Sequence, residues 1–177
     1  GPAGLLWHPV HHRGNATSSP EEALAGVRLV REALAGEVTE PGTSAPAHSV
    51  TTTASRPLSQ HDVIVVAPYN AQVECVGAAL ASAGLSQVRV GTVDKFQGQE
   101  AVIAIVTLAA SSAEDVPRGL EFLLMRNRLN VAISRAQWAA HLVSSDRLGS
   151  GLPSTAEGLT ALSGYLRLTE RGRATLH

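Results

Sequence analysis

The chain has 177 residues, of which 44% are hydrophobic and 16% are charged, and its formal net charge is −1. These values predict one globular domain with its own core. They argue against a largely disordered chain and against a protein that binds polyphosphates through a broad basic surface. The sequence has no long apolar run, which excludes a membrane-spanning helix, and a single cysteine, which excludes a disulfide framework and a Cys-based zinc site. Its single lysine, Lys95, lies outside any G-x-x-x-x-G-K-[ST] pattern, which excludes a complete P-loop NTPase.

The N-terminal part predicts a short strand and then a well-marked helix. Residues 5–10 are mostly apolar and fit the strand. Ser19 fits an N-cap, Pro20 the first helical position and Glu22 the third, where its side chain would complete a capping box with Ser19. Residues 37–61 are rich in Pro, Gly, Ser, Thr and Ala, and they predict a flexible loop or insertion.

From residue 62 onward, the sequence alternates between apolar strands and amphipathic helices. Strands are expected over 63–67, 88–93, 102–108 and 139–143. Helices are expected over 71–83, 126–136 and 156–168, the last with an apolar face of Leu159, Leu162 and Leu166. This alternation predicts a parallel sheet covered on two sides, which is an open α/β sandwich. In such sheets ligands bind beyond the carboxyl ends of the strands, and polar clusters are expected there at 68–72, 94–100 and 111–115.

Two of these polar segments have the composition of a ligand site. Ala67–Gln72 places Asn70 and Gln72 at a strand-to-helix junction, where backbone N–H groups can meet an anion. Gly91–Glu100 gathers a hydroxyl, two acids, a base, two amides and a glycine within one short segment. Such a segment can hydrogen-bond a phosphate, a ribose or a nucleic-acid backbone. The alternative for the first segment is a turn that only caps a helix.

The third segment, Arg126–Arg135, predicts a helix with two arginines along one side. Arg128 and Arg135 are separated by two helical turns. Two guanidinium groups on one face suit a dispersed negative charge, such as a phosphoryl group in transfer. The alternative is a solvent-exposed helix face whose arginines pair with Glu121 or Asp146.

Together and in this order, the three segments resemble the second RecA-like domain of superfamily 1 helicases, in the branch of the nonsense-mediated-decay helicase. The similar segments are Val63–Gln72 for motif IV, Gly91–Glu100 for motif V and Arg128–Ala136 for motif VI. The similarity covers most of Gly4–Ser144 and fades over 145–177, and it is greatest to bacterial proteins in which such a helicase follows a RecB-like nuclease domain. The resemblance implies a RecA-like three-layer α/β sandwich with a mainly parallel sheet, which is a P-loop NTPase fold without its own P-loop. It also implies that residues 1–177 form a single C-terminal helicase domain.

The resemblance also implies roles for residues that match the motifs. Arg135, the last arginine of motif VI, would be the arginine finger that stabilises charge on the γ-phosphate of ATP. Glu100 would contact the nucleotide ribose, with Gly98 and Arg128 as further residues of the nucleotide site. Single-stranded nucleic acid would be bound by five residues, which are Pro68, Tyr69, Asn70, Gln72 and Thr92.

The same resemblance implies that the chain works with groups that it does not contain. In the family, the phosphate-binding lysine and the Mg²⁺-binding acids lie in the first RecA-like domain, so ATP and Mg²⁺ would be held mainly there and the isolated chain would be inactive. The expected partners are that first domain, in the same parent chain or in trans, single-stranded nucleic acid (DNA rather than RNA), and a RecB-like nuclease domain of the parent protein. The expected setting is the bacterial cytoplasm, with no membrane contact.

Two other functions stay open on the sequence alone. The first is a non-catalytic nucleic-acid-binding module, whose binding of single strands would depend on salt and not on ATP. The second is a generic α/β nucleotide-binding domain. The second would gain support if replacing Arg135 and Glu100 left a two-domain helicase fully active.

Five aromatic and histidine side chains outside the motifs are predicted to have structural roles. His8, His11 and His12 are interpreted as surface or strand-edge residues rather than metal ligands, because no acid or cysteine lies near them in the sequence. Trp7 and Trp138 flank apolar runs, and both are interpreted as core residues. No metal site is therefore expected.

Overall fold

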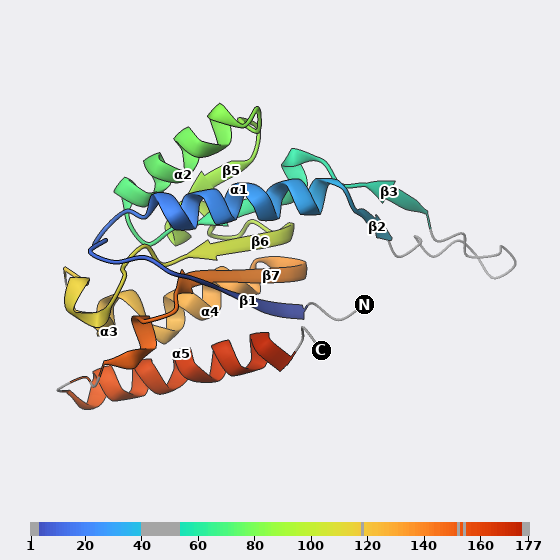
Figure 1. Ribbon diagram of the computed structural model, residues 1–177. Coiled ribbons are helices and arrows are strands. Elements are labelled where there is room, and N and C mark those ends of the chain that lie inside the picture. Colours follow the sequence, from blue (N-terminus) through green and yellow to red (C-terminus); the bar gives the residue numbers. More distant parts are fainter. Residues whose placement is uncertain (1–3, 40–53, 118, 152, 154, 175–177) are drawn as a thin grey trace, which may run out of the picture.

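The computed structural model describes residues 4–39, 54–117, 119–151, 153 and 155–174, and a sheet of five strands lies at its centre (Figure 1). The strands are β1 (Gly4–Val10), β4 (Val63–Val66), β5 (Arg89–Gly91), β6 (Ala101–Thr107) and β7 (Ala136–Ser145). They lie in the order β1-β7-β6-β4-β5, and every neighbouring pair is parallel. Every residue of β4 and β6 is buried, as expected for strands covered on both faces. The sheet confirms the predicted α/β, RecA-like fold.

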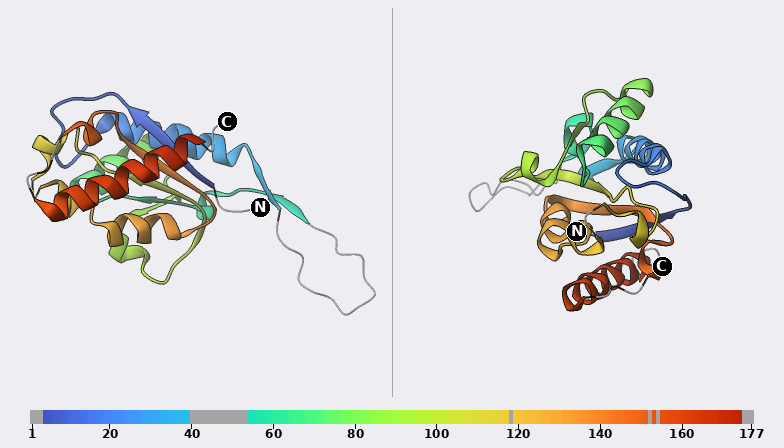
Figure 2. Two further views of the ribbon diagram at one scale, coloured as in Figure 1. Left: turned by 90° about the horizontal axis from the view of Figure 1, so that it is seen from below. Right: turned by 90° about the vertical axis from the view of Figure 1, so that its left-hand side faces the viewer.

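Helices cover the sheet on both sides, which gives three layers (Figure 2). The longer helices are α1 (Pro20–Leu34), α2 (Asn70–Ser82), α4 (Arg126–Ser134) and α5 (Ala156–Ala174). α1 and α2 pack on one face around one apolar cluster, and α4 and α5 pack on the other face around a second cluster. Short helices fill connections: η1 (Gln60–Asp62), η2 (Val93–Phe96), η3 (Ala113–Asp115), α3 (Leu120–Leu123) and η4 (Leu148–Ser150). None of the described helices is both long and apolar enough to cross a membrane.

The segment predicted as a flexible loop contains a small hairpin at its two ends. β2 (Glu37–Thr39) pairs with β3 (Ser55–Pro57) in the antiparallel sense. Arg56 on β3 holds both carboxylate oxygens of Asp62, at 2.7 and 2.8 Å, so the hairpin is tied to the start of β4. The prediction of a loop was therefore wrong at these ends, and residues 40–53 lie outside the described residues.

Helix α1 begins at Pro20 as predicted, but only half of the expected capping box forms. Ser19 Oγ accepts a hydrogen bond from the Glu22 backbone nitrogen at 3.1 Å, as an N-cap should. The Glu22 side chain does not return to the Ser19 backbone. Instead, the Ser19 nitrogen donates to Gln72 Oε1 at 2.7 Å, so a residue of α2 accepts the hydrogen bond that was expected to go to Glu22.

Helix α5 packs on the sheet with a different face from the predicted one. Leu162 is buried, but Leu159 and Leu166 are 50% and 41% exposed. The buried residues of the helix are Gly158, Ala161, Leu162, Tyr165, Thr169 and Gly172. A Cβ on Gly172 would lie 2.7 Å from the backbone nitrogen of Trp7, so the missing side chain lets α5 approach β1 closely. Trp7 itself is buried, as predicted for a core residue.

The three N-terminal histidines occupy three separate environments. His8 Nε2 lies 2.9 Å from His141 Nδ1 across β1 and β7, and the two rings stack. His11 is exposed, with Nδ1 3.2 Å from Asp146 Oδ2. His12 is only 3% exposed, so its interpretation as a surface residue was wrong. Among the described residues, no group of three or more His, Cys, Asp or Glu side chains could hold a metal ion.

The stacked histidines are expected to make stability depend on pH. Burial lowers the pKa of His141 from 6.5 to about 4, and burial and the nearby Arg28 lower the pKa of His8. Because the unfolded chain binds protons at His141 below pH 6.5 and the folded chain does not until about pH 4, the free energy of unfolding should fall as pH drops through this range, by up to about 1.4 kcal/mol per pH unit. Urea unfolding followed by circular dichroism measures this slope. The His141→Gln variant should reduce it, and an unchanged slope would contradict the assignment.

Candidate functional site

The segment Gly91–Glu100 runs from the side of the sheet where the strands end to the side where they begin. We call these two sides the carboxyl edge and the amino edge. Because β5 and β6 are parallel, the chain leaves β5 at its carboxyl end and must return to the amino end of β6. It passes through η2 and then turns at Gly98, whose φ of +73° favours glycine. Thr92 therefore lies at the carboxyl edge and Glu100 at the amino edge. The expectation that all polar clusters gather at the carboxyl ends was wrong for Glu100.

At the carboxyl edge, four of the predicted strand-binding residues come together around one hollow. The hollow has a volume of about 360 Å³. Its lining residues are Thr17, Pro68, Tyr69, Asn70, Thr92, Pro117 and Phe122. Pro68, Tyr69 and Asn70 arrive from the end of β4, and Thr92 arrives from the end of β5. Thr17, Pro117 and Phe122 were not predicted as site residues, because they come from segments without a recognisable motif.

Gln72 does not join the other predicted strand-binding residues. Its side chain is fully buried, and its amide is bound to both backbone groups of Ser19. It accepts from the Ser19 nitrogen at 2.7 Å and donates to the Ser19 oxygen at 3.5 Å. In this structure Gln72 joins α1 to the start of α2, and its buried side chain is not accessible to a ligand.

At the amino edge, Glu100 and Arg135 occupy neighbouring strand entrances. Arg135 follows α4 as its C-cap, and its backbone oxygen accepts from the Ala101 nitrogen at 3.0 Å. The Glu100 side chain is exposed, and its Oε2 accepts from Gln137 Nε2 at 3.1 Å. The Nε atom of Arg135 is buried and makes no hydrogen bond within the described part of the chain. A buried guanidinium nitrogen of this kind is costly unless a ligand or partner completes it.

A bulge in β7 lies close in sequence to Arg135. Ala101 pairs with Ala136, but Ile103 pairs with Ala139, so β7 has one extra residue in this interval. Bulges of this kind re-aim side chains and are frequent next to functional sites. Trp138 lies in the bulge and is 43% exposed, so its interpretation as a core residue was wrong.

Arg128 lies in α4, two helical turns before Arg135, as predicted. Its side chain is outside the described residues, so its role as a nucleotide-site residue stays a prediction. Lys95, the only lysine of the chain, donates to the Val90 backbone oxygen at 2.8 Å. It thereby packs over Gly91, where a Cβ would collide with the lysine side chain.

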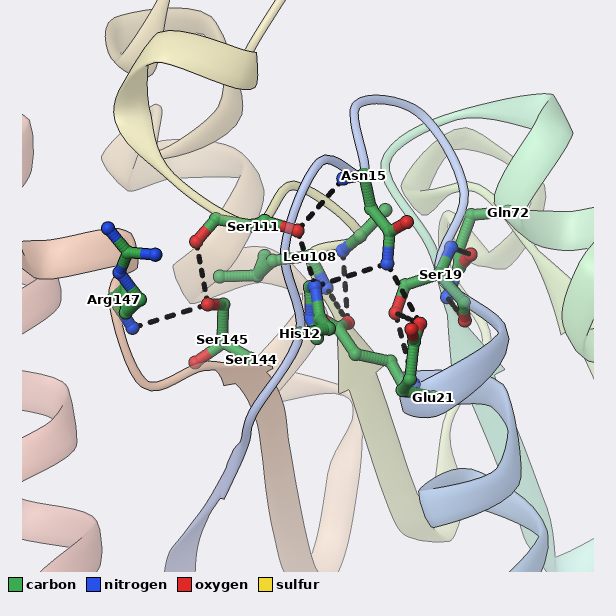
Figure 3. A network of polar contacts seen from close by, with 12 residues as sticks. His12, Asn15, Ser19, Glu21, Gln72, Leu108, Ser111, Ser144, Ser145 and Arg147 are labelled. Atoms are coloured by element: carbon green, nitrogen blue, oxygen red, sulfur yellow. Dashed lines mark hydrogen bonds and ion pairs between the residues drawn. The ribbon is translucent and has the colours of Figure 1, made fainter.

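A buried polar network lies beside the hollow, at the carboxyl ends of β1, β6 and β7 (Figure 3). The Oε1 atom of Glu22 lies 2.9 Å from His12 Nε2, and the other ring nitrogen of His12 lies 2.6 Å from Ser111 Oγ. Ser111 Oγ also accepts from the Asn15 backbone nitrogen at 2.9 Å. Glu22, His12 and Ser111 are each at most 3% exposed.

The network fixes the segment that joins β1 to α1. A second bond, from the Ser111 nitrogen to the Asn15 oxygen at 2.9 Å, pairs the two backbones. Ser145 Oγ donates to the Ser111 oxygen at 2.6 Å, which adds the end of β7. Because Thr17 lies between the two fixed points Asn15 and Ser19, the network also places one wall of the hollow. These contacts were not predicted from the sequence, because the residues that make them lie far apart in the chain.

Comparison with known proteins matches a family model described as an AAA domain to residues 15–147. The chain is 38% identical over 92 residues to the human RNA helicase Mov10l1, an alignment that covers 50% of this chain and 7% of that protein. It is 45% identical over 78 residues to the DNA polymerase alpha-associated DNA helicase A of Schizosaccharomyces pombe, covering 44% and 11%. It is 40% identical over 76 residues to the DNA replication ATP-dependent helicase/nuclease DNA2 of Bos taurus, covering 43% and 7%. The alignments thus span only 7% to 11% of these relatives, which are all eukaryotic.

Proposed function

The chain belongs to the AAA domain family and is a C-terminal domain of a superfamily 1 helicase, and from this premise we propose that the two edges of its sheet act on two different ligands. The amino edge, with Arg135 and Glu100, acts on the nucleotide. The carboxyl edge, with the hollow beside Tyr69 and Thr92, binds the single strand. The observation that carries this proposal is the separation of the motif residues into two groups joined by the single segment Gly91–Glu100.

Arg135 fits the role of an arginine finger. Its guanidinium has a buried nitrogen without a hydrogen bond in the described structure, and α4 and β7 hold its backbone on both sides. When bound, ATP with Mg²⁺ supplies the γ-phosphoryl group that water attacks. Arg135 would donate to the oxygens of that group and stabilise the charge that develops on them. A rigidly held donor of this kind needs little reorganisation during the reaction.

Glu100, Gly98 and Arg128 complete the proposed nucleotide side. Glu100 has a carboxylate oxygen suited to accept from a ribose hydroxyl, while Gln137 holds the other oxygen. Gly98 allows the turn that brings Glu100 to this edge. Arg128 supports the motif or pairs with the partner domain. The chain has no P-loop, so we propose that the isolated chain does not hydrolyse ATP and that a first RecA-like domain, in the same parent chain or in trans, holds the phosphates and Mg²⁺.

We take single-stranded DNA as the ligand of the carboxyl edge, with RNA as the alternative that a binding experiment decides. A RecB-like nuclease domain in the parent protein and a bacterial cytoplasmic setting remain further proposals. The relatives compared above include an RNA helicase, a DNA helicase and a helicase/nuclease, so they leave both nucleic acids open. A non-catalytic strand-binding module is the second candidate function, because this chain alone supplies the described residues that line the hollow.

Strand binding tests the carboxyl edge directly. The purified chain should bind a fluorescent single-stranded oligonucleotide without ATP, and its affinity should fall as salt rises. Replacing Asn70 by alanine and Thr92 by valine should weaken binding by about 10-fold or more, because each change removes a polar contact to the strand. Fluorescence anisotropy with DNA and RNA strands of equal length measures both effects. Leu166→Ala, on the exposed face of α5, is the control, and equal affinities for all variants would contradict the proposal.

A further inference from the structure

Two aromatic rings from distant segments meet at the carboxyl-edge hollow. Tyr69 precedes α2, and Phe122 lies in α3, a turn located at the same end of the molecule as the start of α2 (Figure 1). The ring centroids lie 6.3 Å apart, with an angle of 28° between the ring planes. Both rings are partly exposed and line the hollow. The hollow therefore has an aromatic wall.

The remaining lining of the hollow is polar but uncharged. Thr17, Asn70 and Thr92 bring two hydroxyl groups and one amide, and two prolines complete the surface. None of the seven lining residues in the described structure carries a charge. Such a lining offers hydrogen-bond donors and acceptors to a ligand that also packs against the rings. It suits a flat, neutral group with hydrogen-bonding edges.

We propose that this hollow takes one unpaired base of the bound strand, which packs against the wall made by Tyr69 and Phe122. This inference rests on the proposed function and extends it by adding Phe122 and Thr17 as contact residues. A nucleobase has a π-face for the aromatic wall and polar edges for the amide and hydroxyl groups. Every base has such a face, so the site should accept a base with little sequence preference.

The two new residues are held in place independently of each other. α3 follows a glycine with a φ of +82°, Gly119, and Phe122 is fixed by the apolar neighbours of α3 in the core. Thr17 lies in the segment between Asn15 and Ser19, which the buried network and Gln72 fix at either end (Figure 3). The hollow is thus formed before any ligand enters, which lowers the entropic cost of binding.

The test compares two strands that differ only in their bases. One is a single-stranded oligonucleotide of thymidines, and the other is a fully abasic strand with the same number of phosphates. The wild-type chain should bind the abasic strand about 10-fold more weakly or worse, because base stacking is lost. In Phe122→Leu, which keeps an apolar side chain of similar reach, this difference should shrink several-fold. Trp138→Leu makes the same kind of change at the opposite edge and should keep the full difference.

Each outcome separates the inference from the proposed function. Equal binding of both strands by the wild-type chain would overturn the base site and leave a backbone-only contact. An undiminished difference in Phe122→Leu would overturn the role of Phe122. Binding of neither strand would overturn the strand-binding edge itself, and the base site with it. If circular dichroism shows that Phe122→Leu is unfolded, Tyr69→Leu carries the same comparison from the other ring.

Discussion

Arg135→Ala is expected to lower the rate of ATP hydrolysis by about 10³–10⁵-fold in a helicase that contains this domain together with a first motor domain. The physical reason is that a guanidinium donates to phosphoryl oxygens as their charge develops, and a water molecule that replaces it must reorganise during the reaction. The Nε atom of Arg135 is buried and makes no hydrogen bond within the described residues, so no hydrogen bond at this atom ties the side chain to the fold. Steady-state phosphate release measures kcat.

Two comparisons make this expectation specific. Arg135→Lys keeps the positive charge but loses the planar fork of donors, so it should restore only a small part of the rate. Binding of a single strand should stay at the wild-type value in both variants, because Arg135 and the hollow lie at opposite edges of the sheet. A variant Arg135→Ala that hydrolyses ATP at the normal rate would rule out the arginine finger.

The fold was predictable because its signals are local and repeated. β4 and β6 are continuous runs of apolar, mostly β-branched residues, and such runs fit a strand buried on both faces in any topology. The start of α1 is marked by Ser19 and Pro20, whose effect depends only on their own backbone positions. These features need no information about the distant parts of the chain.

The errors concern side chains whose partners are distant in sequence. Glu22 stands at the capping-box position, but its carboxylate accepts from the Leu108 and Ala109 nitrogens, which are more than 80 residues away. Trp138 is exposed because of a bulge in the pairing of β7 with β6, and one strand's sequence does not reveal its partner's register. Local rules could not have identified either arrangement.

The candidate site likewise combines residues that were predictable from the sequence with residues that were not. Pro68, Tyr69, Asn70 and Thr92 were recognisable because they belong to motifs at strand ends, and the structure brings them together. Phe122 lies in the short helix α3, outside the three motifs, so its place in the hollow depends on how α3 packs against the sheet. Periodicity likewise selected the wrong face of α5, because the deciding feature is the close approach of Gly172 to Trp7.

Glu22→Ala is expected to lower the free energy of unfolding by about 3–5 kcal/mol, because each buried donor left without an acceptor costs about 1–3 kcal/mol. Glu22 is 0% exposed, and its Oε2 accepts from the Leu108 and Ala109 nitrogens at 2.9 and 3.0 Å. Its Oε1 lies 2.9 Å from His12 Nε2. Alanine would leave two backbone N–H groups and one imidazole nitrogen buried without acceptors. The midpoint and slope of urea unfolding, followed by circular dichroism, give the loss directly.

The same carboxylate holds a backbone segment that leads to the hollow. Ala109 has a φ of +68°, a left-handed conformation that costs an L-residue about 1–2 kcal/mol. The hydrogen bond from its nitrogen to Glu22 helps to hold this conformation, and Ser111, two residues later, fixes Asn15 and the wall of the hollow. Glu22→Ala should therefore weaken strand binding even at temperatures where the chain stays folded.

Two variants separate the buried carboxylate from a general effect of charge. Glu22→Gln keeps one oxygen acceptor in the same place and should lose less stability than Glu22→Ala. Glu32→Ala removes an exposed acid from the same helix, where Glu32 lies 3.9 Å from Arg28, and should change stability by less than about 0.5 kcal/mol. If Glu22→Ala unfolds at the same urea concentration as Glu32→Ala, the network contributes no net stability and the position of Thr17 must be fixed by Ser19 and Gln72 alone.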